Sequence, residues 1–125
     1  LNSGSTFAFE YTGGGAGAAT DLVEVNGTLS INSATLTLVD LGSYTLWEKF
    51  TLFSYESLTG TFSGLADDSV FTANGGDWLI NYDDATAGLN GGSGANYVTI
   101  TAVPEPGAAL LGGLGVLALL RRRRN

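Results

Sequence analysis

The chain has 125 residues and a mass of 12.8 kDa, enough for one domain with its own core and too little for two. Lys49 is the only cation before residue 121, against twelve acidic residues, so we expect no nucleic-acid partner, because such binding needs Lys and Arg to neutralise phosphates. The absence of Cys and His excludes disulfides, thiolate nucleophiles, the usual zinc ligands and the commonest general base.

The first residues carry no sign of an export signal. The chain contains no Met and begins at Leu1 within a polar stretch, without a charged region followed by an apolar one. We therefore expect the sequence to be the C-terminal part of a longer protein.

Up to about residue 102 the sequence consists of short runs in which apolar and polar residues alternate, as half-buried strands require. Turns rich in Asn and Gly separate the runs, for example Asn26-Gly27 and Asn74-Gly75-Gly76, because these residues adopt positive φ angles readily. No helical period extends over more than two turns before Pro104. The predicted strands are 5–11, 21–25, 28–31, 34–40, 49–55, 60–65, 77–82 and 96–102.

The spacing of these strands predicts an all-β fold and leaves two architectures open. Short strands at intervals of roughly ten residues fit a β-solenoid or a small β-sandwich. Residues 21–38 contain three successive short runs with apolar residues, separated only by Asn, Gly and Ser. This spacing favours the tight corners of a solenoid. Since a rung cannot bury its faces alone, we expect the end of a solenoid stack, with the sandwich as the alternative.

Residues 13–18, GGGAGA, formally satisfy the dinucleotide-binding pattern G-x-G-x-x-A. That site also needs a helix N-terminus to hold the pyrophosphate. The following residues instead alternate with period two and contain an Asn-Gly turn, so we expect a flexible loop here and no cofactor.

Two pairs of carboxylates, Asp67-Asp68 and Asp83-Asp84, are the candidates for a calcium site or for a glycosidase acid and base. Neither pair has the spacing of a known calcium loop, so we expect solvated turn residues and no metal. Without His and Cys an enzyme would have to rely on Asp and Glu alone. We therefore expect a protein without catalytic residues.

The aromatic residues suggest an alternative role. Trp47 and Trp78, with the five tyrosines, could stack on sugar rings as a carbohydrate-binding surface. Large rings also fill the small cores of ordinary β proteins. A surface-displayed carbohydrate-binding module is therefore the second functional hypothesis.

The C-terminus has a different composition from the rest of the chain. Residues 107–120 form an uncharged run of Ala, Leu, Val and Gly, which as a short hydrophobic helix would reach about 21 Å, less than a hydrocarbon core of about 30 Å. The run is apolar on all faces, which argues against a soluble core helix. It therefore predicts a minimal transmembrane segment.

A basic cluster follows this run, and basic residues keep their end of a segment in the cytoplasm, so residues 1–102 would lie outside it. On the other side, Pro104 and Pro106 keep the chain extended and accessible to a processing enzyme. The residues predicted to set the orientation are Arg121, Arg122, Arg123 and Arg124.

The order Val103-Pro104-Glu105-Pro106, apolar run, four arginines resembles the PEP-CTERM sorting signal of Gram-negative bacteria. The resemblance covers residues 103–125. It implies an exported protein held transiently in the inner membrane and handed to an exosortase, a membrane enzyme that cuts near Pro-Glu-Pro, often alongside exopolysaccharide production. Pro104, Glu105 and Pro106 would then be recognition residues of a substrate.

The body has a weaker resemblance, carried by strand order and glycine placement. DLVEVNGTLSINSATLTLVD, YTLWEKFTLFSYESLTGTFSGL, DWLINYD and NYVTITAVPEP are similar to the C-terminal end of proteins with autotransporter-associated β-strand repeats. That resemblance implies the end of a right-handed parallel β-solenoid. No membrane β-barrel sequence follows, and the sorting tail stands in its place.

The expected organisation is thus a β-rich extracytoplasmic domain over residues 1–102 and a sorting tail over residues 103–125. The expected function is that of a non-enzymatic structural protein of the cell surface or extracellular matrix, possessing no cofactor.

Overall fold

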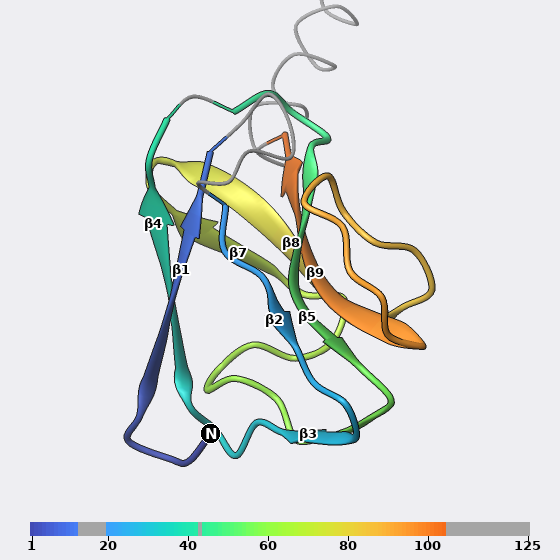
Figure 1. The fold of residues 1–125 in the computed structure, drawn as a ribbon. Helices are drawn as coiled ribbons and strands as arrows, with labels where there is room; N and C mark the ends of the chain where they lie inside the picture. Colours follow the sequence, from blue (N-terminus) through green and yellow to red (C-terminus); the bar gives the residue numbers. More distant parts are fainter. Residues whose placement is uncertain (13–19, 43, 105–125) are drawn as a thin grey trace, which may run out of the picture.

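The computed structural model describes residues 1–12, 20–42 and 44–104, which form an all-β fold without a helix. The strands lie in three sheets, and β1 and β4 run side by side apart from the largest one (Figure 1). The strands of the described residues are β1 (Thr6–Tyr11), β2 (Val23–Glu24), β3 (Thr28–Ser30), β4 (Thr35–Asp40), β5 (Lys49–Tyr55), β6 (Ser57–Thr59), β7 (Val70–Ala73), β8 (Gly76–Asp84) and β9 (Asn96–Val103).

The first six strands form three parallel pairs, β1 with β4, β2 with β5 and β3 with β6. In the first pair Thr6 lies opposite Thr35, and in the second Val23 lies opposite Phe53, at almost the same offset along the sequence. The third pair repeats the offset of the first. Strands β4, β5 and β6 therefore lie beside β1, β2 and β3, respectively, at a nearly constant sequence separation.

The last three strands pair antiparallel with their neighbours. The largest sheet has the order β2-β5-β9-β8-β7, so β9 lies between β5 and β8. Asn74 and Gly75 form the two-residue turn of the β7–β8 hairpin, with φ values of 53° and 76°. Two successive positive φ angles are typical of a type I′ turn, which Asn-Gly favours, and this predicted turn is confirmed.

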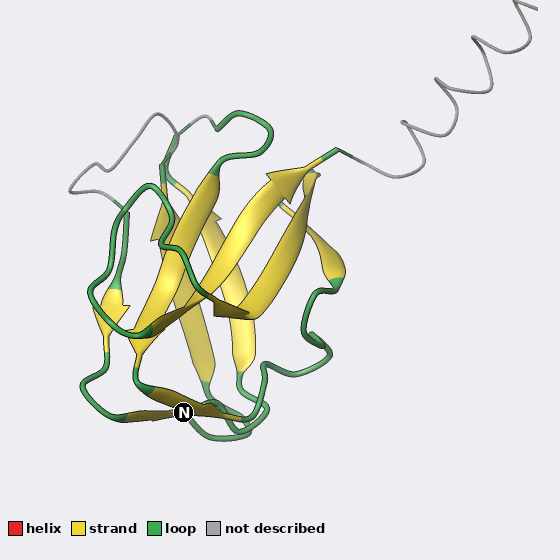
Figure 2. Cartoon of the chain, turned by 90° about the vertical axis from the view of Figure 1, so that its right-hand side faces the viewer, coloured by secondary structure: helices red, strands yellow, loops and turns green. Residues whose placement is uncertain are grey.

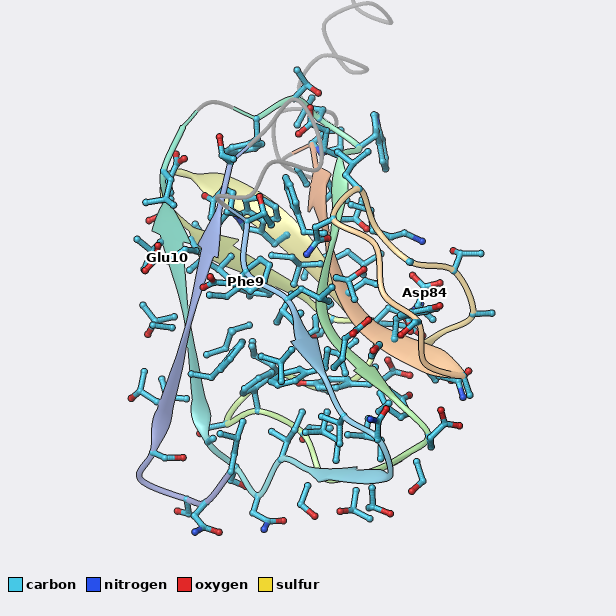
Figure 3. The ribbon with its side chains drawn as sticks, in the orientation of Figure 1. Phe9, Glu10 and Asp84 are labelled. Carbon is cyan, nitrogen blue, oxygen red and sulfur yellow. The ribbon has the colours of Figure 1, made fainter. Side chains whose placement is uncertain are left out.

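The core is built from the alternating faces of the strands. In β1, Phe9 is buried and points into the body, whereas the adjacent Glu10 is exposed and points away (Figure 3). Trp78 of β8 packs its ring 5.0 Å from that of Tyr11 and 6.2 Å from that of Phe50, centroid to centroid. One aromatic core thus joins the parallel strands to the antiparallel ones.

Strand β5 departs from simple alternation, since each residue from Phe50 to Tyr55 is buried. The loop after β8 covers its second face. The Gly88 N–H donates to the Thr51 Oγ1 at 2.7 Å, and a Cβ on Gly88 would lie 2.5 Å from the Lys49 carbonyl oxygen. Because Gly88 has no side chain, the loop can pack this closely against the backbone of β5.

One predicted strand, 60–65, is wrong. Strand β6 ends at Thr59, and Gly60 and Gly64 take φ values of +81° and +71°, which no extended strand permits. Phe62 nevertheless enters the core with 1% exposure, so its side chain packs as an apolar residue although its backbone forms no strand. Strand β7, absent from the prediction, completes the hairpin instead.

Candidate sorting junction at the end of β9

The described chain ends directly after the central strand of the largest sheet. Ala102 is fully buried; its N–H donates to the Glu48 carbonyl at 3.0 Å, and its own carbonyl accepts the Trp47 N–H at 2.6 Å. On the other side Val103 pairs with Asp77 of β8. The strand is therefore held on both edges up to its last residue.

Pro104 follows β9 and is the first residue outside the sheet. Proline lacks an N–H and cannot extend a central ladder, so pairing stops where the Pro-Glu-Pro sequence begins. Figures 1 and 2 place the N-terminus at the end of the body opposite to this exit. Glu105, Pro106 and the predicted membrane and basic segments, with Arg121 to Arg124, lie outside the described residues.

Three exposed apolar side chains lie beside the exit. Leu46, Trp47 and Leu89 are 54%, 66% and 44% exposed, and we call them the exit patch. They line an open depression of about 390 Å³. The Leu89 N–H donates to the Lys49 carbonyl at 2.8 Å, which fixes the loop that carries Leu89 against the start of β5.

Asn90 is the side chain that holds this loop in place. Its Oδ1 accepts the Thr51 N–H, and its Nδ2 donates to the carbonyls of Thr51 and Asp21, each at 2.7 Å. The amide thus fills an edge position of β5 beyond the end of β2. This role could not be predicted from the sequence, because a lone Asn in a Gly-rich loop is indistinguishable from a turn residue.

Among the described residues, Lys49 forms an ion pair with Asp84, with its Nζ 3.0 Å from Asp84 Oδ2. Burial raises the pKa of Asp84, but hydrogen bonds from the Thr86 backbone, Lys49, Thr99 and the Thr86 hydroxyl outweigh it, so the pKa lies below its ordinary value. Asp84 is therefore a structural anchor that joins β8, β9 and the following loop (Figure 3).

The other candidate carboxylates have local roles. Asp67 Oδ1 accepts the Tyr82 N–H at 2.9 Å, and Asp67 raises the pKa of its exposed neighbour Asp68 by charge repulsion, with Asp83 contributing less. Over the described ranges, no three acidic side chains gather in a group that could hold a metal ion. The expectation of a non-enzymatic protein without metal stays a prediction.

The two tryptophans occupy opposite environments. Trp78 is fully buried, and its Nε1–H donates to the Ala73 carbonyl at 3.2 Å, so this ring has no face available to a sugar and the stacking hypothesis is wrong for it. Trp47 is exposed, and for it the hypothesis remains a prediction. The loop GGGAGA, within residues 13–19, lies outside the described residues.

Within the described part of the chain, no helix is long and apolar enough to cross a membrane. No curated protein and no solved structure matches the chain. One family matches: residues 102–124 correspond to the PEP-CTERM protein-sorting motif. The match begins in the last two residues of β9 and continues through Pro104. Such a motif implies an exported protein of Gram-negative bacteria that is processed at the membrane and sorted by an exosortase.

Proposed function

We propose that this chain is a structural protein of the cell surface or extracellular matrix, with a C-terminal tail that serves as a transient sorting handle. The observation that carries the proposal is the position of the motif. Ala102 lies in the core and Pro104 is not paired, so the Pro-Glu-Pro recognition residues begin where β9 ends. An enzyme that binds Pro104, Glu105 and Pro106 would not need to unfold the body.

The tail supports a membrane-held intermediate. Residues 107–120 carry no charge, and four arginines follow them. A thinned or locally adapted bilayer accommodates a short span at modest cost, and the arginines remain on the cytoplasmic side. The exosortase would then meet its substrate at the outer face of the inner membrane.

Two variants of the full chain, expressed in its native host, test the sorting step. Removal of residues 104–125 should leave the body unsorted and without a membrane-held form. The triple substitution Pro104→Ala, Glu105→Ala, Pro106→Ala keeps the apolar run and the arginines, so it should accumulate uncut in the inner membrane. Intact mass distinguishes these forms, and a surface form that still ends in RRRRN would contradict the proposal.

For the body, we propose the end of a β-solenoid with a structural role. The three parallel pairs, which share a nearly constant sequence offset, support two successive coils, and parallel pairing is unlike the antiparallel sheets of a sandwich. Beyond β5 the antiparallel strand β9 takes the place that a third coil would occupy. The β7–β9 segment therefore acts as a cap that ends the stack.

A short internal repeat supports the same proposal. Leu1-Asn2-Ser3 and Ile31-Asn32-Ser33 precede β1 and β4, respectively. The Leu1 nitrogen donates to the Ser30 carbonyl at 2.8 Å, and the Asn32 N–H donates to the Leu1 carbonyl at 3.3 Å. This pattern aligns Leu1 with Ile31, so the outer edge of β3 already pairs with backbone in the parallel register of the coils.

A tandem duplication tests whether that edge accepts a coil. A second copy of residues 1–30 is placed before Leu1, so that Ser30 of the added copy precedes Leu1 as it precedes Ile31. We expect a single unfolding transition, a larger urea m-value and slower amide exchange at the outer edges of β1 and β3.

The control carries Phe9→Pro and Leu29→Pro in the added copy only, which removes two N–H groups directed at the next coil. It should lose the added protection while the original body stays folded. An added copy that remains unfolded in the unsubstituted chain would contradict the solenoid proposal and leave the sorting proposal intact.

A further inference from the structure

We propose that the exit patch, Leu46, Trp47 and Leu89, is a membrane-docking surface that rests on the outer face of the bilayer while the tail is inserted. The inference rests on the proposed membrane-held intermediate and adds a second contact to it. The occupant is the lipid interface itself.

The first argument is distance along the chain. The backbone N–H of Trp47 is bonded to the carbonyl of Ala102, and four residues separate Ala102 from the apolar run at Gly107. A fully extended chain spans at most about 3.6 Å per residue, so Gly107 lies within about 18 Å of Ala102 in any conformation. Insertion of the run therefore brings the exit patch to the membrane surface.

The second argument is the chemistry of the patch. Tryptophan concentrates at membrane interfaces, where its ring enters the apolar boundary and its N–H stays hydrated. Trp47 is 66% exposed although it adopts φ +72°, a strained conformation for a bulky residue. Leu46 and Leu89 line the same depression as Trp47 and add to its exposed apolar surface. The body thus holds an apolar group outward at the one end where lipid is near.

The third argument is charge. The body carries eleven acidic residues before Pro104 and one lysine, so most of its surface is repelled by anionic headgroups. Lys49, the single lysine, lines the same depression, as does Glu48, whose Oε1 accepts the Thr45 hydroxyl at 2.7 Å. Docking therefore relies on apolar contact, and it should be stronger on zwitterionic than on anionic lipid.

Fluorescence of the full chain in phosphatidylcholine vesicles measures the docking, because Trp47 is exposed and Trp78 is buried. Lipids brominated on the acyl chain near the headgroup should quench part of the emission, and Trp47→Phe should abolish that quenching. Leu46→Asp should lower the ratio of docked to undocked bodies about tenfold, the loss expected when the burial of one leucine side chain is removed.

Leu1→Asp is the matched control. Leu1 is a 39% exposed leucine at the end of the body opposite to the exit, so the same substitution there should leave the quenching unchanged. Replacing about one phosphatidylcholine in three by phosphatidylglycerol should weaken the quenching by repulsion.

Insertion of the tail is measured separately, through a dye on Asn125→Cys that becomes inaccessible to an external quencher. An inserted tail without quenching of Trp47 would overturn the docking inference and leave the sorting proposal standing. Failure of insertion would overturn the proposed intermediate itself. A shift of Trp47 emission by soluble polysaccharide without vesicles would assign the patch to carbohydrate and also overturn the inference.

Discussion

The parallel region, residues 6–59, and the antiparallel region, residues 70–103, build β-structure from opposite kinds of contact. In the parallel region every pair joins strands that are far apart in the sequence, and β2 and β3 contribute only two and three residues. In the antiparallel region a two-residue turn joins β7 to β8, and β8 and β9 are the longest strands described.

This difference indicates which region depends on the other. A hairpin with a type I′ turn forms from local contacts, whereas short parallel strands require the entire chain turn to be closed first. Strand β5 belongs to both regions, since it pairs with β2 on one edge and with β9 on the other. We infer that the antiparallel region provides the template on which β5 and its parallel partner β2 are ordered.

The largest expected effect comes from the residue that joins the two regions. Trp78→Ala should lower the free energy of unfolding by about 4 kcal/mol, because a fully buried ring and its contacts with Tyr11 and Phe50 are lost. Urea unfolding monitored by circular dichroism measures it. Trp47→Ala, the exposed counterpart, should change stability by less than about 0.5 kcal/mol.

Urea unfolding of the parent chain also tests the coupling of the regions. A single transition is expected, because one aromatic cluster spans both. Two separate transitions in the parent chain would show that the regions fold independently and would refute the template inference.

A glycine substitution tests the close contact directly after the β3–β6 pair. Gly60→Ala should cost about 3 kcal/mol, since φ is +81° and the added Cβ would lie 2.1 Å from the Ile31 carbonyl oxygen, directly after the β3–β6 pair. Gly64→Ala is the control. Its φ is +71° but a Cβ meets nothing within 4 Å, so about 1 kcal/mol is expected. Equal costs for the two would contradict the close approach of Gly60 to the Ile31 backbone.

Asn90→Ala tests the side chain that fixes the loop after β8 against β5. Loss of its three hydrogen bonds should cost about 2 kcal/mol and speed amide exchange at Thr51. In the control Asn81→Ala, an exposed bond to the Asp83 N–H is lost, and the effect should stay below about 0.5 kcal/mol. Unchanged exchange at Thr51 would refute the role of Asn90.

The smallest effect concerns pH. The folded pKa of Asp84 lies below its unfolded value of about 3.9, so its stabilisation is complete above that value and is lost as the pH falls through the folded pKa. The free energy of unfolding should therefore fall more steeply below about pH 4 in the parent chain than in Asp84→Asn. Asp83→Asn removes a charge from the adjacent position and is the control; identical pH slopes for the parent chain and Asp84→Asn would contradict the anchor role.

Much of the β-structure could be predicted because alternation is a local property. The runs 5–11 and 49–55 agree with β1 and β5 to within a residue, and the Asn74-Gly75 turn follows from the conformational freedom of those two residues. The predicted strand 60–65 is wrong because Gly60 and Gly64 adopt positive φ angles. Glycine adopts positive and negative φ about equally readily, so the sequence does not indicate which one it takes. Strand β7 was missed because it is short and two of its four residues are exposed.

The candidate sites also differ in how far the sequence alone could identify them. The sorting motif is a linear signal, so Pro104, Glu105 and Pro106 could be identified without a structure, and residues 102–124 match the family. The two tryptophans could not be distinguished, since each lies in an aromatic-rich run. Burial of Trp78 and exposure of Trp47 depend on which residues the sheet brings opposite them.

The sequence by itself determined the all-β class, the acidic body, several turns and the sorting tail, because each depends on residue type and short-range order. Tertiary structure decided the parallel pairing of β2 with β5, the antiparallel strand β9 on the other edge of β5, and the gathering of Leu46, Trp47 and Leu89 at the exit. These features arise from contacts between residues far apart in the chain, which alternation and composition do not encode. The physical reason is that a strand's faces are specified locally, whereas its partner is chosen by the packing of the whole core.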